Sequence, residues 1–197
     1  MPLKVIDRAS GAALELEEIK SHLNVNHNLQ DSLLEFLASS VTLATEQYLN
    51  RTLVWTKYEF ALREKKYRFK LSKPPLIDVE QVQVYDGEQM QILDEGDYDY
   101  DKRREPGIVR INDDVNIIQP TSDDLNYASL VTYVAGYTEE KDAAQNEAIP
   151  DNIKLWMLNV VGTFYLQRET IRVGTIVRDM RNELSVMIAN ERVYTFM

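Results

Sequence analysis

The chain has 197 residues, an apolar fraction of 44% and a formal net charge of −10. This length fits one domain with a buried core, and the lack of cysteine excludes disulfides, thiolate metal sites and a cysteine nucleophile. Tight duplex binding relies on Lys and Arg that neutralise phosphates, so the acidic balance argues against it. We find no signal-peptide core and no membrane-length apolar run, so we expect a soluble cytoplasmic protein without membrane contact.

Two amphipathic helices are expected near the N-terminus. Residues 14–23 carry apolar side chains at helical spacing, with acidic residues in the first turn. A longer helix is expected from about residue 30 to residue 51, where Leu33, Phe36 and Leu43 widen the apolar face. So wide a face indicates contact on more than one side, either within the core or with a neighbouring subunit.

A block of short strands follows. Apolar and polar residues alternate with a period of two in several segments, at residues 53–62, 67–71, 79–85, 90–93, 98–100, 108–111 and 130–134. The pair Asp86-Gly87 predicts a hairpin turn between two of these strands. Pro74-Pro75 excludes a helix in this region.

The C-terminal third is expected to be helical again. A polar loop over residues 138–148 leads to Pro150, and the run from Ile153 to Glu169 has an unbroken helical period. A short helix is expected over residues 182–189, and residues 192–196 are apolar enough to dock on another surface.

Strands in one block with helices at both ends predict an α+β fold. We expect a single domain over residues 1–197. The helical segments, about 14–51 and 150–190, would form a small α-helical bundle, and residues 53–135 would form a central antiparallel β insertion.

No pattern in the chain points to catalysis. The segment Asp97-Tyr98-Asp99-Tyr100-Asp101 opens like a calcium loop, but Lys102 and Ile108 stand where that loop needs Gly and Glu. His22 and His27 are separated by a polar break and make a poor zinc site. We therefore expect no catalytic, cofactor-binding or metal-binding residues and no enzymatic activity. A carboxylate- or metal-dependent hydrolase is the less favoured alternative.

Basic residues interleave with aromatic residues over residues 63–70. Such a segment can bind single-stranded nucleic acid. It can also be a charged edge strand that discourages misassembly, or a basic patch that meets an acidic surface on the next subunit. In an acidic chain the charged-edge interpretation is favoured over nucleic-acid binding.

Several short motifs occur in a fixed order along the chain. They are LELEEIKSHL at 14–23, D-x-L-L followed by E-x-Y-x-x-R within 31–51, LSKPPLIDV at 71–79, VYDG at 84–87, VTYVAGY at 131–137, Ile149-Pro150, and Arg168-Glu169. This order resembles the head–tail connector proteins of tailed phages, also called adaptor or head-completion proteins. Two places depart from the family pattern: Gln119-Pro120 stands where a Trp-Pro pair is expected, and residues 187–192 differ from the usual closing motif.

The resemblance implies a virion structural protein without an active site. Connectors form a homo-oligomeric ring beneath the portal of a DNA-filled head, extend its channel toward the tail and retain packaged DNA. The implied partners are other copies of the chain, the portal protein, a downstream tail or stopper protein, and double-stranded DNA that passes without specific binding. The protein would be made in the host cytoplasm and reside at the head–tail junction. A tail-completion or tail-terminator role is the nearest alternative.

A closed ring needs two different faces on each subunit. We expect subunit or partner contacts at exposed apolar and basic residues, namely Leu33, Phe36, Leu43, Arg63, Lys65, Lys66, Arg68, Tyr194 and Phe196. An acidic channel wall would repel phosphates and keep the duplex from adhering. The polar segments 142–148 and 172–181 are expected to become ordered on docking.

Overall fold

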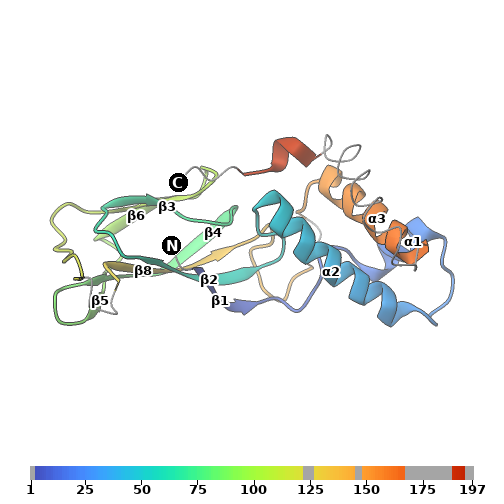
Figure 1. Cartoon of the computed structure of the whole chain (residues 1–197), viewed down its shortest axis with the longest axis horizontal. Helices are drawn as coiled ribbons and strands as arrows, with labels where there is room; N and C mark the ends of the chain where they lie inside the picture. Colours follow the sequence, from blue (N-terminus) through green and yellow to red (C-terminus); the bar gives the residue numbers. More distant parts are fainter. Residues whose placement is uncertain (1–2, 122–126, 145–147, 167–187, 194–197) are drawn as a thin grey trace.

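The helices gather at one end of the molecule and the strands at the other (Figure 1). The computed structural model describes residues 3–121, 127–144, 148–166 and 188–193. The elements in chain order are β1 (Leu3–Arg8), α1 (Leu16–Leu23), α2 (Asp31–Leu49), β2 (Thr56–Leu62), β3 (Arg68–Lys70), β4 (Leu76–Tyr85), β5 (Met90–Ile92), β6 (Tyr98–Asp101), β7 (Ile108–Ile111), β8 (Ser129–Ala135), α3 (Asp151–Leu166) and a 3₁₀ turn at Ala189–Glu191. The α+β class predicted from the sequence is confirmed.

Helices α1 and α2 begin and end within about two residues of the positions that their sequences predict. The backbone N–H of Glu15 donates to the Glu18 carboxylate at 3.2 Å, at the start of α1. Helices α1 and α2 both end on an asparagine in the left-handed region, Asn24 with φ 55° and Asn50 with φ 54°. In the described part of the chain, no helix is both long and apolar enough to cross a membrane.

Side chains from all three helices share one buried apolar cluster. Its helical members include Ile19, Leu34, Ala38, Val41, Leu49, Ile153, Met157, Val160 and Val161. Ile188, next to the 3₁₀ turn, is fully buried in the same cluster. The segment 188–193 therefore packs against the helices although it lies far from α1 and α2 in the sequence.

The strands form two antiparallel sheets that pack face to face. The five-stranded sheet has the order β1-β2-β8-β4-β5, and the three-stranded sheet has the order β3-β7-β6. Their inward side chains form a second buried cluster, which includes Tyr58, Phe60, Phe69, Val82, Val109, Ile111, Val131 and Tyr133. This arrangement is a β-sandwich whose core is separate from the helical cluster.

Strand β1 was not predicted. It pairs with β2 from Leu3↔Phe60 to Arg8↔Thr56, with an irregularity between Val5 and Asp7. Residues 4–6 of β1 are exposed and its other residues are only partly buried, so the strand shows no clear alternation of apolar and polar types. The sheet therefore also draws on residues that precede the helices. The helix expected at 182–189 lies mostly outside the described residues.

Candidate functional site

The outer face of α2 is apolar and exposed. Leu33, Phe36 and Leu43 have exposed fractions of 37%, 67% and 50%. They lie three and seven residues apart, so they share one side of the helix. The opposite side carries the fully buried Leu34 and, at 2% exposure, Val41. The wide apolar face predicted from the sequence is therefore two faces, one in the core and one open.

The basic residues singled out in the sequence lie on the β-sandwich, away from α2 (Figure 1). Arg63 and Lys65 are exposed in the segment between β2 and β3, and Arg68 is exposed on β3. Lys66 forms an ion pair with Glu64 at 2.7 Å. The structure thus divides the predicted interface residues between two surfaces. Tyr194 and Phe196 lie outside the described residues.

Two further basic residues extend this surface: Lys70, which belongs to the basic segment 63–70, and Arg110, which the sequence patterns did not indicate. Lys70 on β3 and Arg110 on β7 are both exposed. Arg68 and Arg110 are register partners, directly opposite one another on adjacent strands. Like charges in that position repel, while on its other side Arg110 has Asp99 of β6 as its register partner. The sequence held a signal for this surface: Phe69 and Val109 alternate with cations, and because both apolar side chains point inward, the neighbouring cations point outward.

The opposite edge of the three-stranded sheet is acidic. Strand β6 places Tyr98 and Tyr100 against the sandwich core and leaves Asp99 exposed, as the alternation predicted. A cleft of 520 Å³ opens beside β6, between it and strands β4 and β5. Its acidic lining residues are Asp78, Glu80, Glu95 and Asp99, and none of the described residues that line it is Lys or Arg.

Tyr100 is one of the residues that line this cleft. Its hydroxyl donates to Asp78 Oδ1 at 2.5 Å. The hydrogen bond, together with partial burial, raises the pKa of Tyr100 to about 12. No group of three acidic or histidine side chains that could hold a metal ion occurs within the described ranges.

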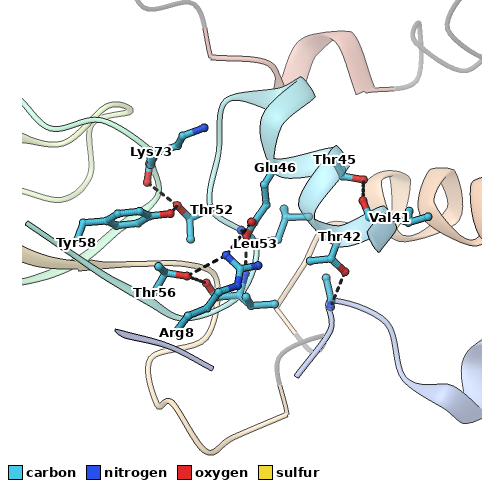
Figure 2. A network of polar contacts seen from close by, with 12 residues as sticks. Arg8, Val41, Thr42, Thr45, Glu46, Thr52, Leu53, Thr56, Tyr58 and Lys73 are labelled. Carbon is cyan, nitrogen blue, oxygen red and sulfur yellow. Dashed lines mark hydrogen bonds and ion pairs between the residues drawn. The ribbon is translucent and has the colours of Figure 1, made fainter. Parts of the chain in front are cut away.

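A carboxylate joins the helices to the sandwich. Glu46 of α2 is nearly buried and accepts hydrogen bonds from the backbone N–H groups of Leu53 at 2.8 Å and Val54 at 3.3 Å. The same carboxylate forms an ion pair with Arg8 of β1, Oε2 to Nη1 at 2.9 Å (Figure 2). Glu46 therefore satisfies the donors of the turn after α2 and ties that turn to the edge strand of the sheet.

Next to this carboxylate, a threonine connects the turn to the sandwich. The Thr52 and Tyr58 hydroxyls lie 3.0 Å apart, within hydrogen-bonding distance (Figure 2). The Thr52 hydroxyl also donates to the carbonyl of Lys73 at 3.1 Å. The two hydroxyls and the Lys73 carbonyl are therefore all paired, which favours a rigid connection between the turn and the sandwich.

An arginine beyond the end of α2 holds the C-terminal segment. The Arg51 side chain is 8% exposed and its Nη2 lies 2.6 Å from Glu105 Oε2, in the loop between β6 and β7. Its Nε donates to the carbonyl of Glu191, and the N–H of Val193 donates to the carbonyl of Leu49 at 2.9 Å. Arg51 therefore links the helices, the sandwich and the segment 188–193.

Comparison with known proteins adds a family and a fold. Residues 13–95 match the model of a family described as phage gp6-like head-tail connector protein. No curated protein matches the chain. The whole chain also has the fold of a chain from the neck of an empty GTA particle computed with C6 symmetry, with a TM-score of 0.75, 16% identity and coverage of 100% of this chain and 98% of the other.

Two further solved structures share the fold over the same extents. The neck of a native GTA particle computed with C12 symmetry gives a TM-score of 0.72 at 17% identity, covering 100% of this chain and 98% of that one. A chain from the virion of a native gene transfer agent (GTA) particle has a TM-score of 0.69 and 15% identity, with the same coverage of both chains. The family match over residues 13–95, together with this shared fold, confirms the resemblance to the head–tail connector proteins of tailed phages, a family of virion structural proteins.

Proposed function

We propose that the protein forms an oligomeric ring that joins the portal of a DNA-filled phage head to the tail, extends the DNA channel and retains packaged DNA. The observation that carries the proposal is the whole-chain likeness, at a TM-score of 0.75, to a chain in the neck of a particle computed with C6 symmetry. The family match over residues 13–95 supports the same role. In this proposal the chain acts as one connector-like domain with a helical bundle, works by assembly and is not an enzyme.

The surfaces of the described residues suit such an assembly. A ring is built from heterologous contacts, in which two different faces of identical subunits meet. The outer face of α2 is apolar, with Phe36 as its most exposed large residue at 67%, whereas the face around Arg68 and Arg110 is basic. A heterologous contact requires two different faces on one subunit, and the described residues provide them. The portal and a tail or stopper protein would occupy surfaces above and below the ring.

The net charge is compatible with a DNA channel. The chain carries a formal charge of −10, and a wall of that sign repels phosphates and lets a duplex pass without specific binding. The protein would then be located at the head–tail junction of the virion after synthesis in the host cytoplasm.

Mass photometry of the purified protein, alone and with purified portal, tests the proposal. We expect a discrete high-mass species that grows with concentration or appears on the portal. A strict monomer that also ignores portal would overturn the ring. A pull-down that captures tail-tube protein but not portal would assign the chain to tail completion instead.

A further inference from the structure

Among the described residues, no strand pairs with either outer strand of the three-stranded sheet. In the order β3-β7-β6 the outer strands are β3 and β6. Ile111 N donates to Tyr67 O and Leu71 N donates to Gly107 O, so alternate residues of β3 face β7. The backbone groups of Arg68 and Lys70 therefore point toward the open edge of β3.

The same alternation applies to β6. Asn112 N donates to Asp97 O, and the register continues with Asp99↔Arg110 and Asp101↔Ile108. The backbone groups of Tyr98 and Tyr100 consequently point away from β7, into the 520 Å³ cleft between β6 and strands β4 and β5. Unpaired edges of this kind are templates for an added strand.

The two edges match in side-chain chemistry as well as in backbone. On the inward side, β3 presents the buried Phe69 and β6 presents Tyr98 and Tyr100, all packed with the sandwich core. On the outward side, β3 presents the exposed cations Arg68 and Lys70. Among the described residues, neither cation forms an ion pair within 4.0 Å. The ion pairs within the sandwich involve other cations, namely Lys57, Lys66, Arg103 and Arg104.

The outward side of β6 carries the opposite charge. Asp99 is exposed, and Asp101 follows it on the same face. Asp101 already accepts a hydrogen bond from Arg104 Nε at 3.2 Å. Asp99 accepts only its neighbour's backbone N–H, from Tyr100 at 2.8 Å, among the hydrogen bonds of the described residues. On β7 its register partner is Arg110, and a cation from a neighbouring subunit would lie on its other, open side.

We infer that the β3 edge of one copy pairs with the β6 edge of the next copy, so that the three-stranded sheets of neighbouring subunits join into one. This inference rests on the ring-forming function proposed above and identifies its contact. Arg68 and Lys70 of one subunit then lie beside Asp99 of the next, and Phe69 continues the apolar side beyond Tyr98 and Tyr100.

The strand directions suit a repeat by rotation. Strands β3 and β6 are each antiparallel to β7, so they run parallel to each other. A subunit related to its neighbour by rotation about a ring axis keeps this direction to within the rotation angle. Its β3 therefore adds parallel to β6, and the operation can be repeated without inverting any subunit.

Cysteine cross-linking tests the contact, because the chain has no cysteine of its own. Arg68→Cys or Lys70→Cys is combined with Asp99→Cys or Asp101→Cys, which gives four double variants. Within one copy β7 separates the two positions by at least about 9–10 Å, whereas a disulfide needs Cα atoms about 4.4–6.8 Å apart. Under mild oxidation of assembled protein, with portal added if rings require it, we expect a ladder of covalent oligomers in at least one pair.

Charge exchange provides the matched functional readout. We expect Asp99→Arg to raise the concentration for half-assembly at least about tenfold, because like charges then meet across the contact. Mixing copies that carry only Arg68→Asp with copies that carry only Asp99→Arg should restore assembly to within about threefold of the original chain. Repulsion from Arg110, the register partner of both positions within one chain, cannot produce this rescue. Glu88→Lys, an exposed change in the turn between β4 and β5, is the control and should leave assembly unaltered.

The outcomes separate the contact from the function. A ladder together with rescue by charge exchange supports the paired edges. If Asp99→Arg forms rings normally and none of the four cysteine double variants gives a ladder, the contact is overturned while the ring-forming function stands. Absence of any ring, alone or on portal, overturns the proposed function and the contact with it.

Discussion

Glu46 of α2 and Arg8 of β1 form an ion pair of 2.9 Å across the junction between the helices and the sandwich, with side-chain exposures of 8% and 26%. The same carboxylate receives the N–H groups of Leu53 and Val54. We expect Glu46→Ala to lower the free energy of unfolding by about 2–4 kcal/mol, because it leaves these donors and Arg8 without their acceptor. Urea denaturation measures the loss. Glu46→Gln keeps one acceptor oxygen and should cost less; equal costs would contradict this role.

Gly136 occupies a position that a side chain cannot enter. Its φ is +142°, and a Cβ there would lie 3.0 Å from backbone atoms of Trp55 and Val54. We expect Gly136→Ala to cost about 2–4 kcal/mol of stability, through strain and this backbone clash. Gly96 is the matched control, since no atom lies within 4 Å of its added Cβ, and Gly96→Ala should stay within about 0.5 kcal/mol. Thermal unfolding of both variants checks the difference.

The outer face of α2 should matter for assembly and not for folding. Phe36 is 67% exposed, so Phe36→Ser should change the free energy of unfolding by less than about 0.5 kcal/mol. If this face is a subunit or partner contact, the same variant should weaken ring formation or portal binding in mass photometry. Leu34→Ser, at a fully buried position two residues away, should instead destabilise the fold by about 3 kcal/mol or more. Unchanged assembly in Phe36→Ser would remove α2 from the interface.

Arg51 should control the docking of the C-terminal segment. We expect Arg51→Gln to remove the ion pair with Glu105 and to loosen residues 188–193, because Arg51 also donates to the Glu191 carbonyl. The measurement is hydrogen exchange at the Val193 amide, which bonds Leu49 O at 2.9 Å in the intact protein. Arg104→Gln, at an exposed position, serves as the control. Unaltered protection of Val193 in Arg51→Gln would show that apolar packing alone holds the segment.

The hydrogen bond to Asp78 gives Tyr100 a pKa of about 12, above the reference value of 10.0. Because the folded-state pKa is raised, the stabilisation is complete below about pH 10 and is lost as the pH rises through 12. The difference between the near-ultraviolet titrations of the original chain and Tyr100→Phe should show one phenol with a midpoint near 12. In an Asp78→Asn background that midpoint should move toward 10. A midpoint unaffected by Asp78→Asn would contradict the assigned cause.

Much of the fold followed from local patterns. The period of α2 and α3 predicted both helices because apolar residues at helical spacing require a partner surface. The hairpin of β4 and β5 followed from Asp86-Gly87. The alternation in β6 placed Tyr98 and Tyr100 inward correctly.

The features that escaped prediction depend on contacts between distant residues. Strand β1 is defined by its pairing with β2, more than 40 residues away along the chain. Glu46 looked like one acidic residue among many, because nothing local shows that it accepts the N–H groups of the following turn. Arg110 joined the basic face only through its register with Arg68. Periodicity describes one element at a time and carries no information about such pairings.

The turn after α2 sets the angle between the two ends of the elongated molecule. The sandwich extends away from the helices in one direction (Figure 1), and the angle at which it leaves them is held by the carboxylate of Glu46. A few degrees of rotation at that point would displace the distant β tip far more than the residues next to the turn. The curvature of any closed assembly built from contacts at both ends would therefore depend on the buried side chains of this junction, Glu46, Thr52 and Arg51.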